Sequence, residues 1–146
     1  MWIQCIAALV LLCSARAELV SYPKLGIKIA KGFNITLFAN PNMASDVYSM
    51  TIDPEGSVVI SSRGYIKRLI DEDGDGIAEK DLLLRQSSSG AMGMLYVDKR
   101  TLLASEGGKF NRYIDEDGDG IFENGPELIG RFGGGEHGIH GIRKDK

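Results

Sequence analysis

Two short stretches carry the residues best suited to chemistry. The octapeptide Ile-Asp-Glu-Asp-Gly-Asp-Gly-Ile occurs at residues 70–77 and returns unchanged at 114–121. Each copy places three aspartates at alternate positions, and a glutamate follows four residues after the last of them. Because two carboxylates about 4 Å apart repel each other by roughly 1 kcal/mol even in water, such density predicts a bound cation. Hard oxygen ligands at this spacing suit Ca²⁺.

The two predicted calcium loops share one ligand plan. Each uses three aspartate carboxylates, the backbone carbonyl of the isoleucine at loop position seven and the closing glutamate, while a glycine permits the sharp turn. The predicted ligands are Asp71, Asp73, Asp75, Ile77 and Glu79 in the first loop, and Asp115, Asp117, Asp119, Ile121 and Glu123 in the second. The alternative is a solvated acidic turn without an ion, but two copies in register favour a metal site.

The loops do not have the EF-hand pattern. An EF-hand needs an acid at position twelve, where this chain has Leu82 in one copy and Pro126 in the other. The flanking stretches 65–70 and 110–114 are rich in β-branched and aromatic residues, which predicts strands rather than helices. The nine-residue form Asp-x-Asp-x-Asp-Gly-x-x-Glu resembles the hairpin-loop calcium sites of some β-propellers.

A 44-residue repeat extends well beyond the loops. It predicts two units, at about 48–91 and 92–135, each with four strands, and the start of a third unit at 136–146. Four strands in about 44 residues is typical of one propeller blade. A further half-buried strand is predicted at 32–38 from its alternating pattern. The expected fold is all-β: an incomplete β-propeller with about two full blades of four antiparallel strands and flanking strands.

Two blades cannot close a ring, because propellers typically use four to eight. A single sheet must also stack on neighbours to cover its faces. The missing blades are expected from a longer chain, of which this is the N-terminal part, or from a partner chain. We favour the longer chain.

Residues 1–17 predict a cleaved signal peptide, and 18–31 an N-terminal arm. An apolar run at 3–13 is too short to span a membrane, and Ala15-Arg16-Ala17 fits a signal peptidase site. The run lacks a preceding Lys or Arg, so a retained anchor is the alternative. Cleavage removes both cysteines and shifts the net charge from −3 to −4, because Arg16 is lost. We expect a secreted or periplasmic protein that does not bind nucleic acid.

The only two histidines, His137 and His140, lie in a glycine-rich strip at 133–141. On a strand, a spacing of three places them on opposite faces, so they would not chelate one metal together. Dense glycines also permit close approach of the backbone to a ligand. The alternative is a flexible connector with incidental histidines.

Several motifs in order resemble a known family. These are the signal peptide, Gly32-Phe-Asn-Ile-Thr-Leu-Phe-Ala39, the two acidic repeats and Gly135-Glu-His-Gly-Ile-His-Gly-Ile-Arg143. Together they look like the N-terminal propeller of large secreted bacterial proteins described as membrane-bound dehydrogenases, which are similar to quinoprotein sugar dehydrogenases. The resemblance implies a six-bladed type of propeller, calcium, pyrroloquinoline quinone as hydride acceptor, and a sugar or polyol substrate. It makes His137 the first candidate for a general base and His140 the second.

The chain also departs from this family. Its members often continue to a cytochrome c-type domain with Cys-x-x-Cys-His, whereas this chain has no cysteine after residue 13 and hence no covalent haem there. A cofactor in the central mouth of a propeller draws on residues from several blades. We therefore expect a calcium-binding segment of an oxidoreductase-like protein that does not complete an active site alone. The alternative is a non-catalytic, calcium-stabilised binding or adhesion module.

Overall fold

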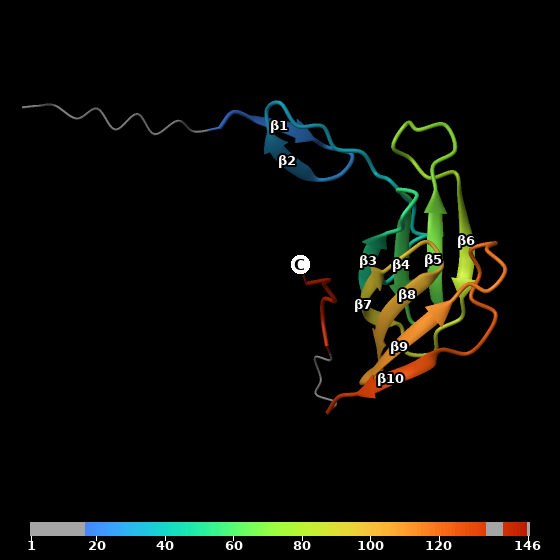
Figure 1. Ribbon diagram of the computed structural model, residues 1–146. Helices are drawn as coiled ribbons and strands as arrows, with labels where there is room; N and C mark the ends of the chain where they lie inside the picture. Colours follow the sequence, from blue (N-terminus) through green and yellow to red (C-terminus); the bar gives the residue numbers. More distant parts are fainter. Residues whose placement is uncertain (1–16, 134–138, 146) are drawn as a thin grey trace, which may run out of the picture. The chain divides into compact units, whose positions relative to one another are not determined.

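The computed structural model describes residues 17–133 and 139–145, and over this range the protein is all-β (Figure 1). Its strands form three antiparallel sheets, and the described residues contain no helix. Accordingly, no described helix could cross a membrane. The predicted signal peptide, apart from Ala17, and His137 lie outside the described residues. The chain divides into a unit up to Ile35 and a larger unit from Thr36 onward.

The first unit contains a β-hairpin where the sequence predicted only an arm. Strands β1 (Leu19–Tyr22) and β2 (Ile27–Ala30) pair antiparallel. The turn between them closes through the Leu25 amide, which donates to the Tyr22 carbonyl at 3.0 Å, and Gly26 adopts a φ of 69°. The prediction of an arm named no strands there, although its Pro-Lys-Leu-Gly turn supplies the geometry that a hairpin needs.

The larger unit contains two four-stranded sheets, one for each predicted repeat. The first sheet has the order β3-β4-β5-β6 and the second the order β7-β8-β9-β10. Their strands are β3 (Ser49–Ile52), β4 (Val58–Ser62), β5 (Tyr65–Ile70), β6 (Lys80–Arg85), β7 (Ala91–Tyr96), β8 (Thr101–Glu106), β9 (Lys109–Ile114) and β10 (Glu127–Arg131). The predicted strands of both repeats are thus confirmed. The ring of a propeller is not present in the described residues, and the propeller stays a prediction.

The main hydrophobic core lies between the two sheets. It includes Val59 and Ile66 from the first sheet, Leu84 from its last strand, and Leu102 and Tyr113 from the second sheet. Phe122, which follows the second acidic loop, also lies in this core and packs against Tyr113 with the ring centroids 5.6 Å apart. Burying a side chain of this size contributes about 1.5–3 kcal/mol. The two sheets therefore stabilise each other.

The first strands of the two sheets lie side by side (Figure 1). The Ser49 hydroxyl donates to the Ala91 carbonyl at 2.8 Å, and the Ala91 amide donates to the Ser61 hydroxyl at 2.8 Å. Both backbone groups of Ala91 are thereby satisfied by side chains of the first sheet. Because buried backbone groups need partners, these serines fix where the second sheet begins.

The strand predicted at 32–38 is wrong. The described backbone there forms no ladder. Instead, the Phe38 carbonyl accepts the Ala78 amide at 2.7 Å, and the Thr36 hydroxyl donates to the Gly76 carbonyl at 3.3 Å. Phe38 packs on a second core cluster around Ile60 and Leu69. The alternating apolar residues do not share a buried face, because Phe33 is 69% and Leu37 is 58% exposed, and Phe38 is the residue of this stretch that packs on the first sheet.

Two neighbouring leucines test this arrangement. Leu84 is fully buried in the core between the sheets, whereas Leu83 on the opposite face of β6 is 40% exposed. Leu84→Ala should lower the free energy of unfolding by about 2–5 kcal/mol, since it removes methyl groups and leaves a cavity. Leu83→Ala should cost less than about 1 kcal/mol. Urea unfolding followed by circular dichroism measures both, and equal losses would contradict this description of the core.

Candidate calcium loops

The first acidic loop joins β5 to β6 and gathers all four predicted carboxylates. One oxygen from each of Asp71, Asp73, Asp75 and Glu79 lies within 4.8 Å of the others. Calcium binds oxygen at about 2.3–2.6 Å, so ligand atoms on opposite sides of one ion lie roughly 4.6–5.2 Å apart. The four carboxylates therefore fit around a single Ca²⁺.

Backbone amides shape this loop. The Asp71 carboxylate accepts the Gly74 amide at 2.7 Å with one oxygen and the Gly76 amide at 2.9 Å with the other. Glu79 accepts the Glu72 amide at 2.7 Å, which ties the end of the loop to its start. Gly74 and Gly76 have φ values of 78° and 86°, a region that a side chain would strain. The same residues that could bind the ion thus also hold the turn.

The second loop joins β9 to β10 and repeats this hydrogen-bond pattern. Asp115 accepts the Gly118 amide at 2.6 Å and the Gly120 amide at 2.9 Å. Asp115, Asp117 and Asp119 form a cluster with the same 4.8 Å limit. Glu123 is not in that cluster, and its backbone carbonyl accepts the Arg85 guanidinium at 2.7 Å. The structure therefore brings together three of the four predicted carboxylates in this loop.

The two isoleucines occupy equivalent places in the loops. The Ile77 amide donates to Asp75 at 2.8 Å, and the Ile121 amide donates to Asp119 at 2.8 Å. The predicted role of their carbonyls as ligands stays a prediction. None of the seven clustered carboxylates forms an ion pair with a described residue, so no side chain neutralises them directly.

Two arginines lie beside the second loop, and the sequence analysis missed both. Arg68, Arg100, Asp115 and Asp119 line one cavity of about 290 Å³. Arg100 donates to the Glu116 carbonyl at 3.0 Å, and Arg68 pairs with Asp53 at 2.8 Å. Comparison of the two repeats could have found Arg100, because the equivalent position 44 residues earlier is Gly56 and the first repeat has no arginine there. The second loop therefore lies in a more positive field than its own acids suggest.

Glu72 lies outside the carboxylate cluster, as predicted from its position in the octapeptide. Its carboxylate forms an ion pair with the Lys80 ammonium, and both side chains are exposed. Exposed pairs contribute little to stability. Glu72 is therefore a suitable control for the effect of removing an acid from this loop.

The histidine site is not assembled within the described residues. His140 is exposed, and the described metal-ligating clusters contain no histidine. The neighbouring Ile139 carbonyl accepts the Ser105 hydroxyl at 2.6 Å, so this short segment lies against the second sheet. The predicted catalytic role of His137 and His140 stays a prediction.

Comparison with protein families, with functionally characterised proteins and with solved structures finds no match to this chain. The resemblance to dehydrogenase-type propellers thus stays a prediction as well, and the loops themselves are the firmest basis for a function.

The two loops should differ in calcium affinity. The first has four clustered carboxylates, whereas the second has three and two nearby arginines. Since affinity follows the charge of the ligand set, the first loop should bind Ca²⁺ more tightly. Arg100→Gln should raise the affinity of the second loop about threefold, because one repelling charge is removed at partly screened distance. Calorimetric titration measures both sites.

Arg63→Gln is the matched control, because Arg63 lies in the exposed turn between β4 and β5, at the end of β5 away from the first loop. It should leave both affinities unchanged. Equal affinities in the two loops, or the same shift from both substitutions, would show that the arginines do not influence the site.

Tyr96 gives a pH dependence that can be measured. Burial raises the pKa of Tyr96 from 10.0 to about 12, although Arg68 opposes the rise. Between about pH 10 and pH 12 the unfolded chain releases this proton while the folded chain keeps it, so the free energy of unfolding should fall as the pH rises. The slope from one group is at most about 1.4 kcal/mol per pH unit. Tyr96→Phe should make the free energy of unfolding fall less steeply with pH over this range, as measured by urea unfolding. The same pH dependence in the variant and the original protein would contradict this prediction.

Proposed function

We propose that the chain is a secreted, calcium-binding segment of a β-propeller, in which each four-stranded sheet is one blade and each acidic loop binds one Ca²⁺. The observation that carries this proposal is a hydrogen bond between successive units that recurs after each acidic loop. Repeated contacts of this kind distinguish stacked blades from two sheets that happen to touch.

The first repeated contact follows each acidic loop. The Ala78 amide donates to the Phe38 carbonyl at 2.7 Å, and the equivalent Phe122 amide donates to the Leu84 carbonyl at 2.9 Å. Leu84 belongs to the last strand of the preceding sheet. Phe38 therefore stands, relative to the first sheet, where the last strand of a preceding unit would stand.

A second contact is similar but not identical in the two units. Ser61 accepts the Ala91 amide at the start of β7, and the equivalent Ser105 donates to the Ile139 carbonyl at 2.6 Å. A Cβ on Gly93 would lie 2.9 Å from the Gly141 nitrogen, so this glycine allows the close approach. Residues 139–141 thus lie against β7 and β8 of the second sheet, through Gly93 and Ser105. This supports the start of a third unit there.

Calcium in such loops would stabilise the contact between blades. The second loop is followed by Phe122 in the shared core, and Arg85 of the preceding sheet donates to the Phe122 carbonyl at 2.8 Å. An ion that fixes the loop therefore also fixes the edge between the sheets. The ion binds the folded loop and scarcely the unfolded chain, which couples binding to stability.

The relation to dehydrogenases belongs to the same proposal. We place the segment in a dehydrogenase-like protein because of the order of its motifs, with pyrroloquinoline quinone and a sugar or polyol supplied at a mouth that several blades share. A non-catalytic binding module is the alternative, and the clustered carboxylates support calcium equally in both. Dye reduction with quinone and sugars, by a protein that contains all blades, separates the two.

Melting curves test calcium binding directly. For a site with a dissociation constant of about 0.1 mM, calcium at about 1 mM adds roughly 1.4 kcal/mol of stability per loop. The melting temperature should rise by several degrees. Asp73→Ala should remove the part of this rise that comes from the first loop. The double variant Asp73→Ala with Asp117→Ala should remove nearly all of the rise.

Glu72→Gln is the control, because Glu72 lies in the same loop but pairs with Lys80 outside the cluster. This variant should keep the full rise in melting temperature. A melting curve that responds neither to calcium nor to chelator, on protein with the expected β-sheet circular dichroism, would refute the calcium sites.

A further inference from the structure

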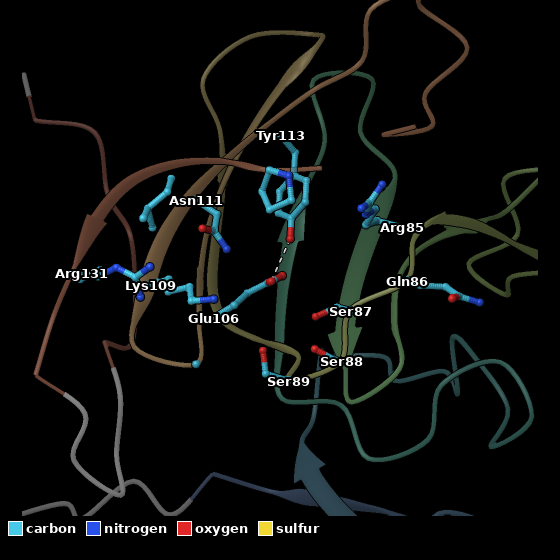
Figure 2. Close-up of a pocket in the computed structure, with 13 residues that line it drawn as sticks. Arg85, Gln86, Ser87, Ser88, Ser89, Glu106, Lys109, Asn111, Tyr113 and Arg131 are labelled. Atoms are coloured by element: carbon cyan, nitrogen blue, oxygen red, sulfur yellow. Dashed lines mark hydrogen bonds between the residues drawn. The ribbon is translucent and has the colours of Figure 1, made fainter. Parts of the chain in front are cut away.

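A polar cavity of about 590 Å³ is lined by residues outside both carboxylate clusters (Figure 2). Its walls come from the connection between β6 and β7, the turn between β8 and β9, and the strands β9 and β10. Ser87, Glu106, Lys109 and Tyr113 are among the residues that line it. Small-molecule sites typically occupy about 300–1,000 Å³ and contain a few convergent polar groups, and this cavity meets both conditions.

Glu106 is the unusual member of this cavity. Its side chain comes from the end of β8 and points toward Tyr113, as Figure 2 shows. The residue is only 8% exposed. Its Oε2 accepts the Tyr113 hydroxyl at 2.8 Å, whereas its Oε1 has no hydrogen-bond partner among the described residues. A buried carboxylate oxygen without a partner is costly, so a donor from a ligand would be favourable.

Oε1 is buried, so a ligand donor reaches it only if the carboxylate turns. The terminal torsion of a glutamate is broad, and this turn is the rearrangement that binding at Oε1 requires. The Tyr113 hydroxyl donates to the other oxygen, Oε2, at 2.8 Å.

The rim of the cavity is positively charged. Lys109 and Arg131 face each other as partners in the ladder between β9 and β10, and neither forms an ion pair with a described residue. Arg85 also lines the cavity, but its guanidinium is held by the carbonyls of Phe122 and Glu123. Lys109 and Arg131 are therefore the cations available to an anionic group.

We propose that this cavity binds a small organic acid that also carries a hydroxyl or ammonium group. The acid group would lie at the rim beside Lys109 and Arg131, and the hydroxyl or ammonium would donate to the free oxygen of Glu106. Two sources share this chemistry, a hydroxy acid and an amino acid. None of the clustered carboxylates lines this cavity. A failure of ligand binding can therefore be distinguished from a failure of calcium binding.

Ligand-observed nuclear magnetic resonance on the full, calcium-saturated chain tests the proposal with glycerate and serine as probes. At least one should bind saturably, and the tighter of the two identifies a hydroxy acid or an amino acid as the source. Acetate lacks the donor and glycerol lacks the acid, so both should bind at least tenfold more weakly. Glu106→Gln should weaken the tighter probe about tenfold or more, because a hydrogen bond to a charged group is lost.

Lys109→Met removes a rim charge from an exposed side chain and should weaken binding severalfold without disturbing the fold. Lys99→Met, at an exposed lysine in the turn between β7 and β8, is its matched control and should leave binding unchanged. The proposal is overturned if neither probe binds, if acetate or glycerol binds as tightly as both, or if Lys109→Met and Lys99→Met have the same effect.

Discussion

The structure depends on the fact that a four-stranded sheet cannot cover both of its faces. Neighbouring residues of β4 show this, because Val59 is buried in the core between the sheets while Ile60 is buried on the opposite face. That opposite face is covered by Phe38 and the residues that follow it, including Met43. The first sheet therefore needs a neighbour on each side, and the chain supplies both. Since successive side chains of a strand point to opposite faces, the same demand arises in every repeat.

The acidic loops solve a different problem, which is to reverse the chain between two strands while its amides remain satisfied. Asp71 and Asp115 each accept two amides from their own loop. An aspartate that accepts backbone amides is already held in place, so an ion that bound there would cost little further conformational entropy. The first loop adds Glu79, which accepts the Glu72 amide. In the second loop the equivalent residue is Glu123, whose backbone carbonyl accepts the Arg85 guanidinium. The two identical octapeptides therefore differ in the contacts of the glutamate that follows them.

The sequence predicts the strands of both repeats well because each repeat contains alternating apolar residues and turns with typical turn residues. It predicts the strand at 32–38 wrongly because alternation alone does not provide a pairing partner. Phe33 and Leu37 are exposed, and the backbone contacts the first sheet only locally, as Phe38 does with Ala78. Seven of the eight predicted carboxylates lie in two clusters, four in the first loop and three in the second, because the members of each cluster are close in sequence. Arg68, Arg100 and the pair of Glu106 and Tyr113 were missed because their partners lie elsewhere in the sequence, on other strands or loops. The polar alternation of Lys109, Asn111 and Tyr113 along β9 was the one available signal of the cavity.

The second loop matters more to the assembly of the sheets than the first. Arg85 of β6 donates to two carbonyls that follow this loop, and the Phe122 amide returns a hydrogen bond to Leu84 of the same strand. Three hydrogen bonds and a buried aromatic ring thus join the loop of one sheet to the edge of the other. The first loop is joined instead to the segment at Thr36 and Phe38. Ordering of the second loop therefore stabilises the contact between the two sheets. Because Asp115 is only 3% exposed, its charge lies inside this junction, and whatever balances that charge contributes directly to holding the sheets together.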